Sequence, residues 1–214
     1  DAAIHFGASV RTIARRRKEF GLDRCTTRYS VQLTTAQKQC LDGCLLGDGG
    51  IEAKQNRFKF KQRADREEYV CWMYDALKPY SIYLRPTSSN LRGRVFHALQ
   101  MATCAHPVFK DLRSRWYRGK QKVVPRDLEL TAFSFAHWYL QDGSNNQKKR
   151  SLRLSTNSFL SEDVEFMCDV MRRDIGISAT MNKQKGQPNI HIGAYDYQKA
   201  LDIIRPHVLW NCLA

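Results

Sequence analysis

The sequence lacks any apolar run that approaches the length of a membrane-spanning helix, and no segment resembles a signal peptide, although the chain opens on Asp1. It also lacks a CxxC pair. The seven cysteines are irregularly spaced, and Cys40 and Cys44, which lie one helical turn apart, have no histidine pair nearby to complete a zinc site. Reduced thiols packed in a core are the better interpretation. These absences predict an intracellular protein, neither secreted nor embedded in a membrane.

Negative charge is scarce as well. Of the 214 residues, 35 are Lys or Arg and 21 are Asp or Glu, so the formal net charge is +14. Such a surplus costs free energy through self-repulsion unless a polyanion relieves it. The hydrophobic content of 43% is ordinary for a globular protein and argues against disorder. A folded protein that binds nucleic acid is therefore the first hypothesis.

One short motif occurs twice. Residues 41–49 (LDGCLLGDG) and 135–143 (FAHWYLQDG) are both apolar runs that end in Leu-x-Asp-Gly. Each run follows a Leu-Thr pair whose threonine, Thr34 or Thr131, can cap a helix, and Gln37 stands in capping-box position after Thr34. The repeat predicts two equivalent helices, each ending at an aspartate.

The elements after each motif also repeat. In both halves an alternating, strand-like stretch comes next, then a helix with an acidic start, a later strand and a closing helix. The sequence therefore predicts a mixed α/β (α+β) fold made of two pseudo-symmetric αββαββα halves, at residues 30–125 and 126–214. The matching segments are 57–63 and 151–157, 65–73 and 161–168, 94–101 and 189–193, and 107–117 and 195–205.

The two repeated aspartates, Asp48 and Asp142, would lie at helix C-termini, where the helix dipole does not favour an anion. The position makes sense if a divalent cation binds there, because carboxylates and exposed backbone carbonyls are hard oxygen ligands suited to Mg²⁺. Paired metal-bound carboxylates over a polyanion suggest phosphodiester hydrolysis. The alternative, a helix cap that starts a hairpin turn, would suffice for one Asp-Gly but not for two in a repeated frame. Small residues would let the helices approach closely, and glycines would give a flexible exit: Gly43, Gly47 and Ala136, then Gly49 and Gly143.

Residues 41–49 match, position for position, the nine-residue motif of the LAGLIDADG endonucleases, and residues 135–143 match it more loosely. The resemblance covers roughly residues 31–214 and is closest to the monomeric enzymes with two motifs. It implies that the halves form a DNA-binding saddle, with the two motif helices at their interface. It also implies a monomer that cuts both strands of a long specific duplex site with Mg²⁺ (or Mn²⁺), leaving short 3′ overhangs. The metal ligands implied are Asp48, Asp142 and the carbonyls of Gly47 and Gln141.

Two details bear on catalysis. Lys122 resembles the lysine that precedes the second half in this family, where it would position water or neutralise transition-state charge; the alternative is a solvated basic linker. The same offset from Asp142 falls just beyond Ala214, which implies either a fragment or two unequal active sites. His137 and the bulky residues that follow it replace small family residues. They predict a looser helix interface, or side chains that point into the core of their own half.

A basic strand face would contact DNA. Arg57, Lys59, Lys61 and Arg63 alternate with two phenylalanines and a glutamine, so period two places all four charges on one face. Such a face suits a sheet in the major groove, whereas single charges elsewhere could serve solubility. Further candidates are Arg92 and Arg94 in the first half, Arg153, Ser155, Asn157 and His191 in the second, and Lys183 and Lys185 at a hairpin tip.

Residues 1–29 lie outside the repeat. Their two helical stretches, broken near residues 7–9, have the size and composition of a helix-turn-helix. The alternative is a basic helical arm. In the helix-turn-helix interpretation the exposed residues that meet DNA are Arg11, Thr12, Arg15 and Arg16.

Two other functions stay open. The chain could bind nucleic acid without cutting it, as a transcription regulator or an intron-splicing maturase, although carboxylates beside phosphates would then only repel. A basic chromatin-associated protein would explain the charge but not the repeated motif.

Overall fold

The computed structural model describes residues 32–91, 93–184 and 186–207, and those from Leu33 onward fall in one compact unit. The predicted helix-turn-helix therefore lies outside the described residues. Six predicted DNA contacts lie outside them as well: Arg11, Thr12, Arg15, Arg16, Arg92 and Lys185. Among the described residues, no helix is long and apolar enough to cross a membrane.

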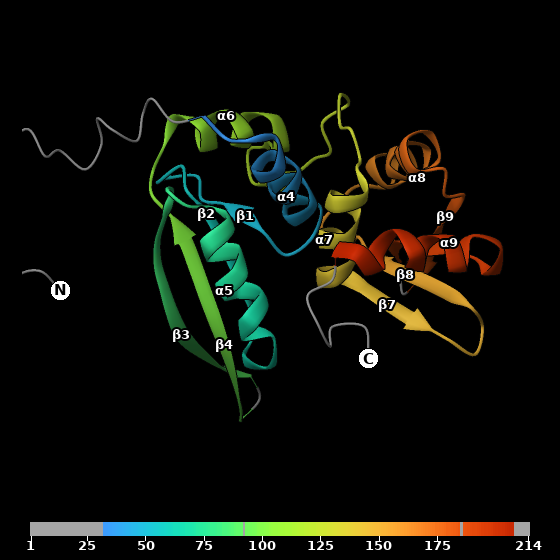
Figure 1. Cartoon of the computed structure of the whole chain (residues 1–214), viewed down its shortest axis with the longest axis horizontal. Helices are drawn as coiled ribbons and strands as arrows, with labels where there is room; N and C mark the ends of the chain where they lie inside the picture. The colour runs from blue at the N-terminus through green and yellow to red at the C-terminus, as the bar shows by residue number, and fades with distance from the viewer. Residues whose placement is uncertain (1–31, 92, 185, 208–214) are drawn as a thin grey trace, which may run out of the picture. The chain divides into compact units, whose positions relative to one another are not determined.

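The first half contains three helices, one four-stranded sheet and a short 3₁₀ helix (Figure 1). The sheet is antiparallel, with strand order β1-β2-β4-β3. In chain order the elements are α4 (Thr35–Leu46), β1 (Gly50–Ile51), β2 (Phe58–Arg63), η1 (Ala64–Arg66), α5 (Glu67–Ala76), β3 (Ser81–Leu91), β4 (Arg94–Thr103) and α6 (Pro107–Trp116).

The second half repeats this order after a small hairpin of β5 (Tyr117–Arg118) and β6 (Gln121–Lys122). Its sheet has the equivalent strand order, β7-β8-β10-β9. The prediction of a mixed α/β fold with two αββαββα halves is confirmed. The elements are α7 (Ala132–Asp142), β7 (Gly143–Asn146), β8 (Ser151–Ser155), α8 (Ser161–Ile175), β9 (Ala179–Gln184), β10 (Gln187–Ile192) and α9 (Ala194–Ile204), followed by η2 (Arg205–His207).

Side-chain caps fix where the two motif helices begin. Thr34 accepts a hydrogen bond from the backbone N–H of Gln37, and the Gln37 side chain accepts one from the N–H of Thr34, as the capping box predicts. Thr131 forms the same reciprocal pair with Ser134 at the start of α7. Both predicted N-caps are confirmed.

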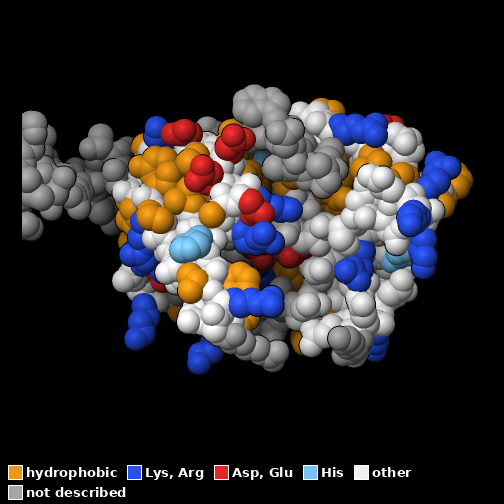
Figure 2. All heavy atoms as spheres, turned by 90° about the horizontal axis from the view of Figure 1, so that it is seen from below, with side chains coloured by type: hydrophobic (Ala, Val, Ile, Leu, Met, Phe, Trp, Pro, Cys, Tyr) orange, Lys and Arg blue, Asp and Glu red, His pale blue; other side chains and the backbone are white. Residues whose placement is uncertain are grey.

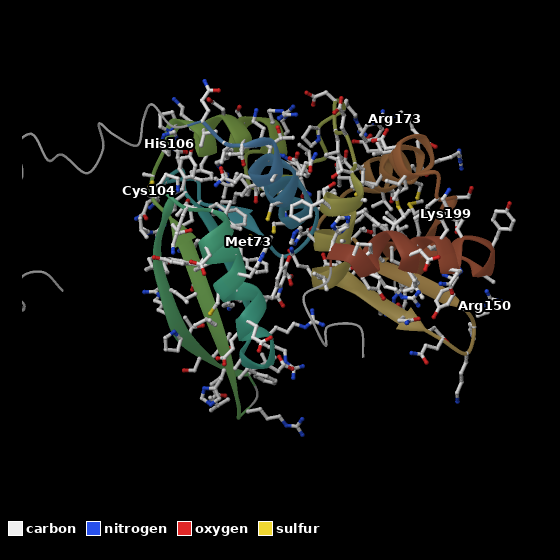
Figure 3. The ribbon with its side chains drawn as sticks, in the orientation of Figure 1. Met73, Cys104, His106, Arg150, Arg173 and Lys199 are labelled. Atoms are coloured by element: carbon white, nitrogen blue, oxygen red, sulfur yellow. The ribbon has the colours of Figure 1, made fainter. Side chains whose placement is uncertain are left out.

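The first core lies between the sheet, α5 and α4. Phe58 and Phe60 are fully buried on the inner face of β2, while Lys61 and Arg63 on the outer face are exposed, as the alternation predicts. Met73 of α5 points toward α4 (Figure 3), and its sulfur lies 3.3 Å from the buried thiol of Cys40. The cysteine is a core residue, as predicted.

Helices α4 and α7 pack against each other between the two sheets (Figure 1). At Gly43 they are so close that an added Cβ would lie 2.4 Å from the carbonyl oxygen of Ser134. The prediction of a looser interface was wrong. The His137 ring stacks on Trp72 and shares a hydrogen bond with the Tyr69 hydroxyl, so it crosses to the first half instead of entering its own core.

Gly43→Ala is expected to lower the free energy of unfolding by about 2 kcal/mol, because the overpacking penalty exceeds the gain in helix propensity. Urea denaturation measures it. Gly50→Ala is the matched control, because its nearest neighbour would lie 3.5 Å from the new Cβ. Equal midpoints for the two variants would contradict the close helix contact.

Candidate active site and nucleic-acid interface

The two acids lie at the ends of the paired helices. Gly47 caps α4 and Asp48 follows it, whereas Asp142 is the last residue of α7. Asp48 is exposed and Asp142 is partly buried. The prediction that both carboxylates stand at the C-terminal ends of the motif helices is confirmed.

Electrostatics show that the two carboxylates are neighbours. Burial, followed by the charge of Asp48, raises the pKa of Asp142 to about 7, while Lys122 opposes the shift. The cost of keeping both acids ionised would be relieved by a cation between them. The fold thus brings together the three residues predicted to be catalytic.

Lys122 reaches this site from β6. Its Nζ donates hydrogen bonds to the carbonyl oxygens of Gly47, at 2.8 Å, and Gly49, at 3.0 Å. Burial lowers its pKa to about 8, although Asp142 and Asp48 oppose the change. The lysine is therefore a positioned, partly buried cation beside the acids, and the solvated-linker alternative is excluded.

Two glutamines also hold Asp48. Gln62 donates from Nε2 to the Asp48 Oδ2 at 2.7 Å, and the Oε1 of Gln141 accepts a hydrogen bond from the Asp48 backbone N–H at 2.8 Å. The sequence reasoning assigned only a carbonyl role to Gln141 and missed Gln62. Strand alternation could have identified Gln62, since it places this polar residue on the buried face of β2.

A glycine follows each acid because there is no room for a side chain at that position, and not because the backbone needs the conformational freedom of glycine. A Cβ on Gly143 would lie 2.3 Å from the carbonyl oxygen of Tyr139, yet Gly143 has φ −77° and ψ 148°, which any residue can adopt. At Gly49 a Cβ would lie 2.7 Å from the Cys44 carbonyl oxygen. The chain therefore turns tightly out of both helices, and the predicted flexible exit was wrong.

The donor set fits a hard divalent cation. Two carboxylates lie close enough to perturb each other, and the Gly47 carbonyl is at the same site. No group of three or more His, Cys, Asp or Glu side chains within the described ranges could hold a metal. A metal at this site would thus need backbone carbonyls, water or substrate oxygens besides the two acids.

The outer face of the first sheet carries the predicted basic row. Lys59, Lys61 and Arg63 alternate along β2, and the register sets Lys61 opposite Gln100 of β4, which is in turn opposite Arg85 of β3. Arg94, at the far end of β4, alternates onto the same face as Gln100. Arg57, just before β2, pairs with Glu52, as does Lys59. The prediction missed two residues of this face, Tyr83 and Arg85.

The outer face of the second sheet is polar. His191 of β10 is directly opposite Arg153 of β8, and Ser155 is opposite Asn189, so the predicted residues share a face. Asn157 lies in the turn that follows β8, and the register assigns Lys183 to the other face of its hairpin. A hollow of about 780 Å³ opens over this sheet. Its lining contains residues that the sequence reasoning missed: Arg66, Ser144, Asn146, Lys148 and Lys149.

The view from below Figure 1 shows Lys and Arg side chains spread over the surface, with acidic side chains recessed near its middle (Figure 2). Asp48 lines a hollow of about 570 Å³ together with Lys61, Arg63 and Arg66. Basic groups thus lie around Asp48, an arrangement that suits phosphates on either side of a reacting one.

Comparisons with known proteins agree with this geometry. The model of the LAGLIDADG DNA endonuclease family matches residues 38–199. The chain is 26% identical over 200 residues to the probable intron-encoded endonuclease 1 of Wickerhamomyces canadensis, covering 85% of each protein. It is also 26% identical to the cytochrome b mRNA maturase bI2 of Debaryomyces hansenii, over 72% of this chain and 63% of that protein.

A solved structure has the same fold. The homing endonuclease I-WcaI, bound to its DNA recognition sequence, superposes with a TM-score of 0.77 over 85% of this chain and 86% of that one. The two sequences are 23% identical in this comparison. The likeness therefore covers both halves of the chain described here.

Proposed function

Since the chain belongs to the LAGLIDADG DNA endonuclease family, we propose that it is a site-specific homing endonuclease that cuts both strands of duplex DNA as a monomer. The observation that carries the proposal is the pairing of Asp48 and Asp142 at the ends of two helices in close contact, with Lys122 beside them. A protein that only bound DNA would gain nothing from two carboxylates near phosphates. The enzyme would act in the cellular compartment that contains its target DNA.

Asp48 and Asp142 would hold Mg²⁺ or Mn²⁺ together with the carbonyls of Gly47 and Gln141. When bound, such an ion activates water and stabilises the leaving oxygen of a phosphodiester. The remaining chemistry belongs to the chain. Lys122, anchored by two carbonyls, would neutralise charge that develops on the phosphate, and its low conformational freedom would limit the cost of that contact.

The two sheet faces would contact the DNA on either side of the acids, in a long target site. The first sheet offers Lys and Arg for phosphates and guanine edges, and the second offers Arg153, His191 and several amides. Such an arrangement predicts a steep salt dependence of affinity with sequence choice added by the amide and guanidinium groups.

Lys61→Ala is expected to weaken binding to all sequences and to reduce the slope of log K against log salt by about one. Lys59→Ala should reduce it less, because Glu52 already pairs with that ammonium group. Fluorescence anisotropy over a salt series measures both slopes. Equal slopes for wild type and Lys61→Ala would remove this face from the phosphate contacts.

A second function, intron splicing as an RNA maturase, is favoured by the similarity to the Debaryomyces hansenii maturase. The two functions differ in substrate and product. A maturase would bind its intron RNA more tightly than duplex DNA and would not need ionised acids at the helix ends.

Incubation with a randomised duplex library, with Mg²⁺ or with EDTA, tests the proposal when all new ends are sequenced. Metal-dependent ends on both strands at one recurrent sequence are expected, and they also identify the target. Selective retention of certain sequences with no new ends would contradict cleavage and favour a binding protein.

A further inference from the structure

A chain of hydrogen bonds links Asp48 to the buried interface between the halves. The Asp48 backbone N–H donates to the Oε1 of Gln141, whose Nε2 donates to the Tyr69 hydroxyl at 3.1 Å. That hydroxyl lies 2.7 Å from the Nδ1 of His137. Gln141 and His137 belong to α7 and Tyr69 belongs to α5, so each of the three bonds crosses between the halves.

The orientation of the Gln141 amide in this chain is determined. Only the amide oxygen of Gln141 can accept from a backbone N–H, so its NH₂ group must face Tyr69. The Tyr69 oxygen then accepts that bond, and the Tyr69 hydroxyl shares a further hydrogen bond with the Nδ1 of His137. Burial lowers the pKa of His137 to about 4, so the ring at the end of the chain is neutral near pH 7. The Gln141 amide thus has one orientation, as a positioning residue requires.

Packing restricts the same residues. Tyr69 is 2% exposed and stacks on both His137 and Trp72. The side chain of Gln141 lies against Gly47, where any Cβ would come within 2.6 Å of its Oε1. The Gln141 amide also donates to the Cys44 sulfur at 3.2 Å. The amide therefore has little freedom to leave the Asp48 N–H.

This arrangement cannot be mirrored at the other acid. The residue before Asp142 is Gln141, whereas the residue before Asp48 is Gly47, which has no side chain to return the contact. Arg66 of the first half binds the carbonyl of Leu140, so the last turn of α7 is held from the first half at two points.

We propose that Gln141, oriented by Tyr69 and His137, is a positioning residue that fixes Asp48 for cleavage, so that the second half sets the geometry of the first half's acid. The inference rests on the proposed endonuclease function. It goes beyond that function in making the two acids unequal, since Gln141 binds the backbone N–H of Asp48 and Gly47 has no side chain to do the same for Asp142.

The test compares Gln141→Ala and Tyr69→Phe with wild type on a plasmid that carries the selected target. Cleavage in the DNA complex should slow at least tenfold for Gln141→Ala and severalfold for Tyr69→Phe, while the dissociation constant for DNA stays within about twofold. If Asp48→Asn slows the cleavage of one DNA strand more than that of the other, Gln141→Ala should slow the same strand more. Gln198→Ala and Tyr195→Phe, both exposed on α9, are the matched controls and should cut like wild type.

Wild-type rates in both variants would overturn the inference while leaving the endonuclease intact. A fall in cleavage that only parallels lost affinity or a lowered melting temperature would overturn it too, because that is a structural defect. Tyr69→Phe guards against such a defect, since it keeps the stacked ring and removes only the hydroxyl. A wild-type protein that does not cut would instead refute the proposed function, and the inference with it.

Discussion

Asp48→Asn is expected to slow cleavage of at least one strand by about a thousandfold or more, with DNA affinity equal to or higher than that of wild type. Asparagine has the shape of aspartate, and its amide oxygen can still accept the hydrogen bond from Gln62. The variant therefore removes the charge and keeps the local structure. Loss of an anion near phosphates is the reason that affinity should not fall.

Single-turnover cleavage of a strand-labelled target measures this rate, and anisotropy measures the affinity. Asp75→Asn is the control, because this exposed residue pairs only with Lys78 among the ion pairs of the described residues. If Asp48→Asn lost binding together with cutting, Asp48 would have a structural role, and the catalytic assignment would be wrong.

Lys122→Met is expected to slow cleavage about a hundredfold, again with little change in affinity. Methionine keeps most of the apolar stem, so the variant removes the charge that stands beside both acids and the donor that binds the Gly47 and Gly49 carbonyls. The expected loss has two sources, the missing transition-state cation and a less fixed loop after α4.

Lys120→Met is the matched control for this prediction. Lys120 lies two residues earlier, in the turn between β5 and β6, and is exposed. The same single-turnover assay should give wild-type rates for it, and Lys122→Arg should recover part of the lost rate because the cation returns. Equal rates for Lys122→Met and Lys120→Met would show that position 122 contributes only to net charge.

Periodicity and repetition predicted the parts of the fold that depend on local sequence. The alternation of Lys and Phe in β2 gave its two faces, and the threonine caps gave the start of both motif helices. The repeated Leu-x-Asp-Gly predicted that Asp48 and Asp142 lie at equivalent helix ends. Such features depend on residues that are close together in the chain, and the sequence shows those residues directly.

The missed features depend on contacts between distant segments. His137 seemed too large for a tight interface, because nothing in the sequence shows that Tyr69 and Trp72 of the other half accommodate it. The side-chain role of Gln141 was hidden for the same reason, since its partners are 72 and 93 residues away. Lys122 was found only through a family resemblance, and its two carbonyl partners come from the packing of β6 near the end of α4.

The measurement that tests the central claim most directly is cleavage of the selected target by wild type and by the double variant Asp48→Asn/Asp142→Asn, each with Mg²⁺ and with EDTA. The account predicts that wild type cuts both strands only with Mg²⁺, and that the double variant binds the same site and cuts neither strand. Cleavage at the same positions by the double variant would contradict it, because the paired acids would then not be the catalytic groups.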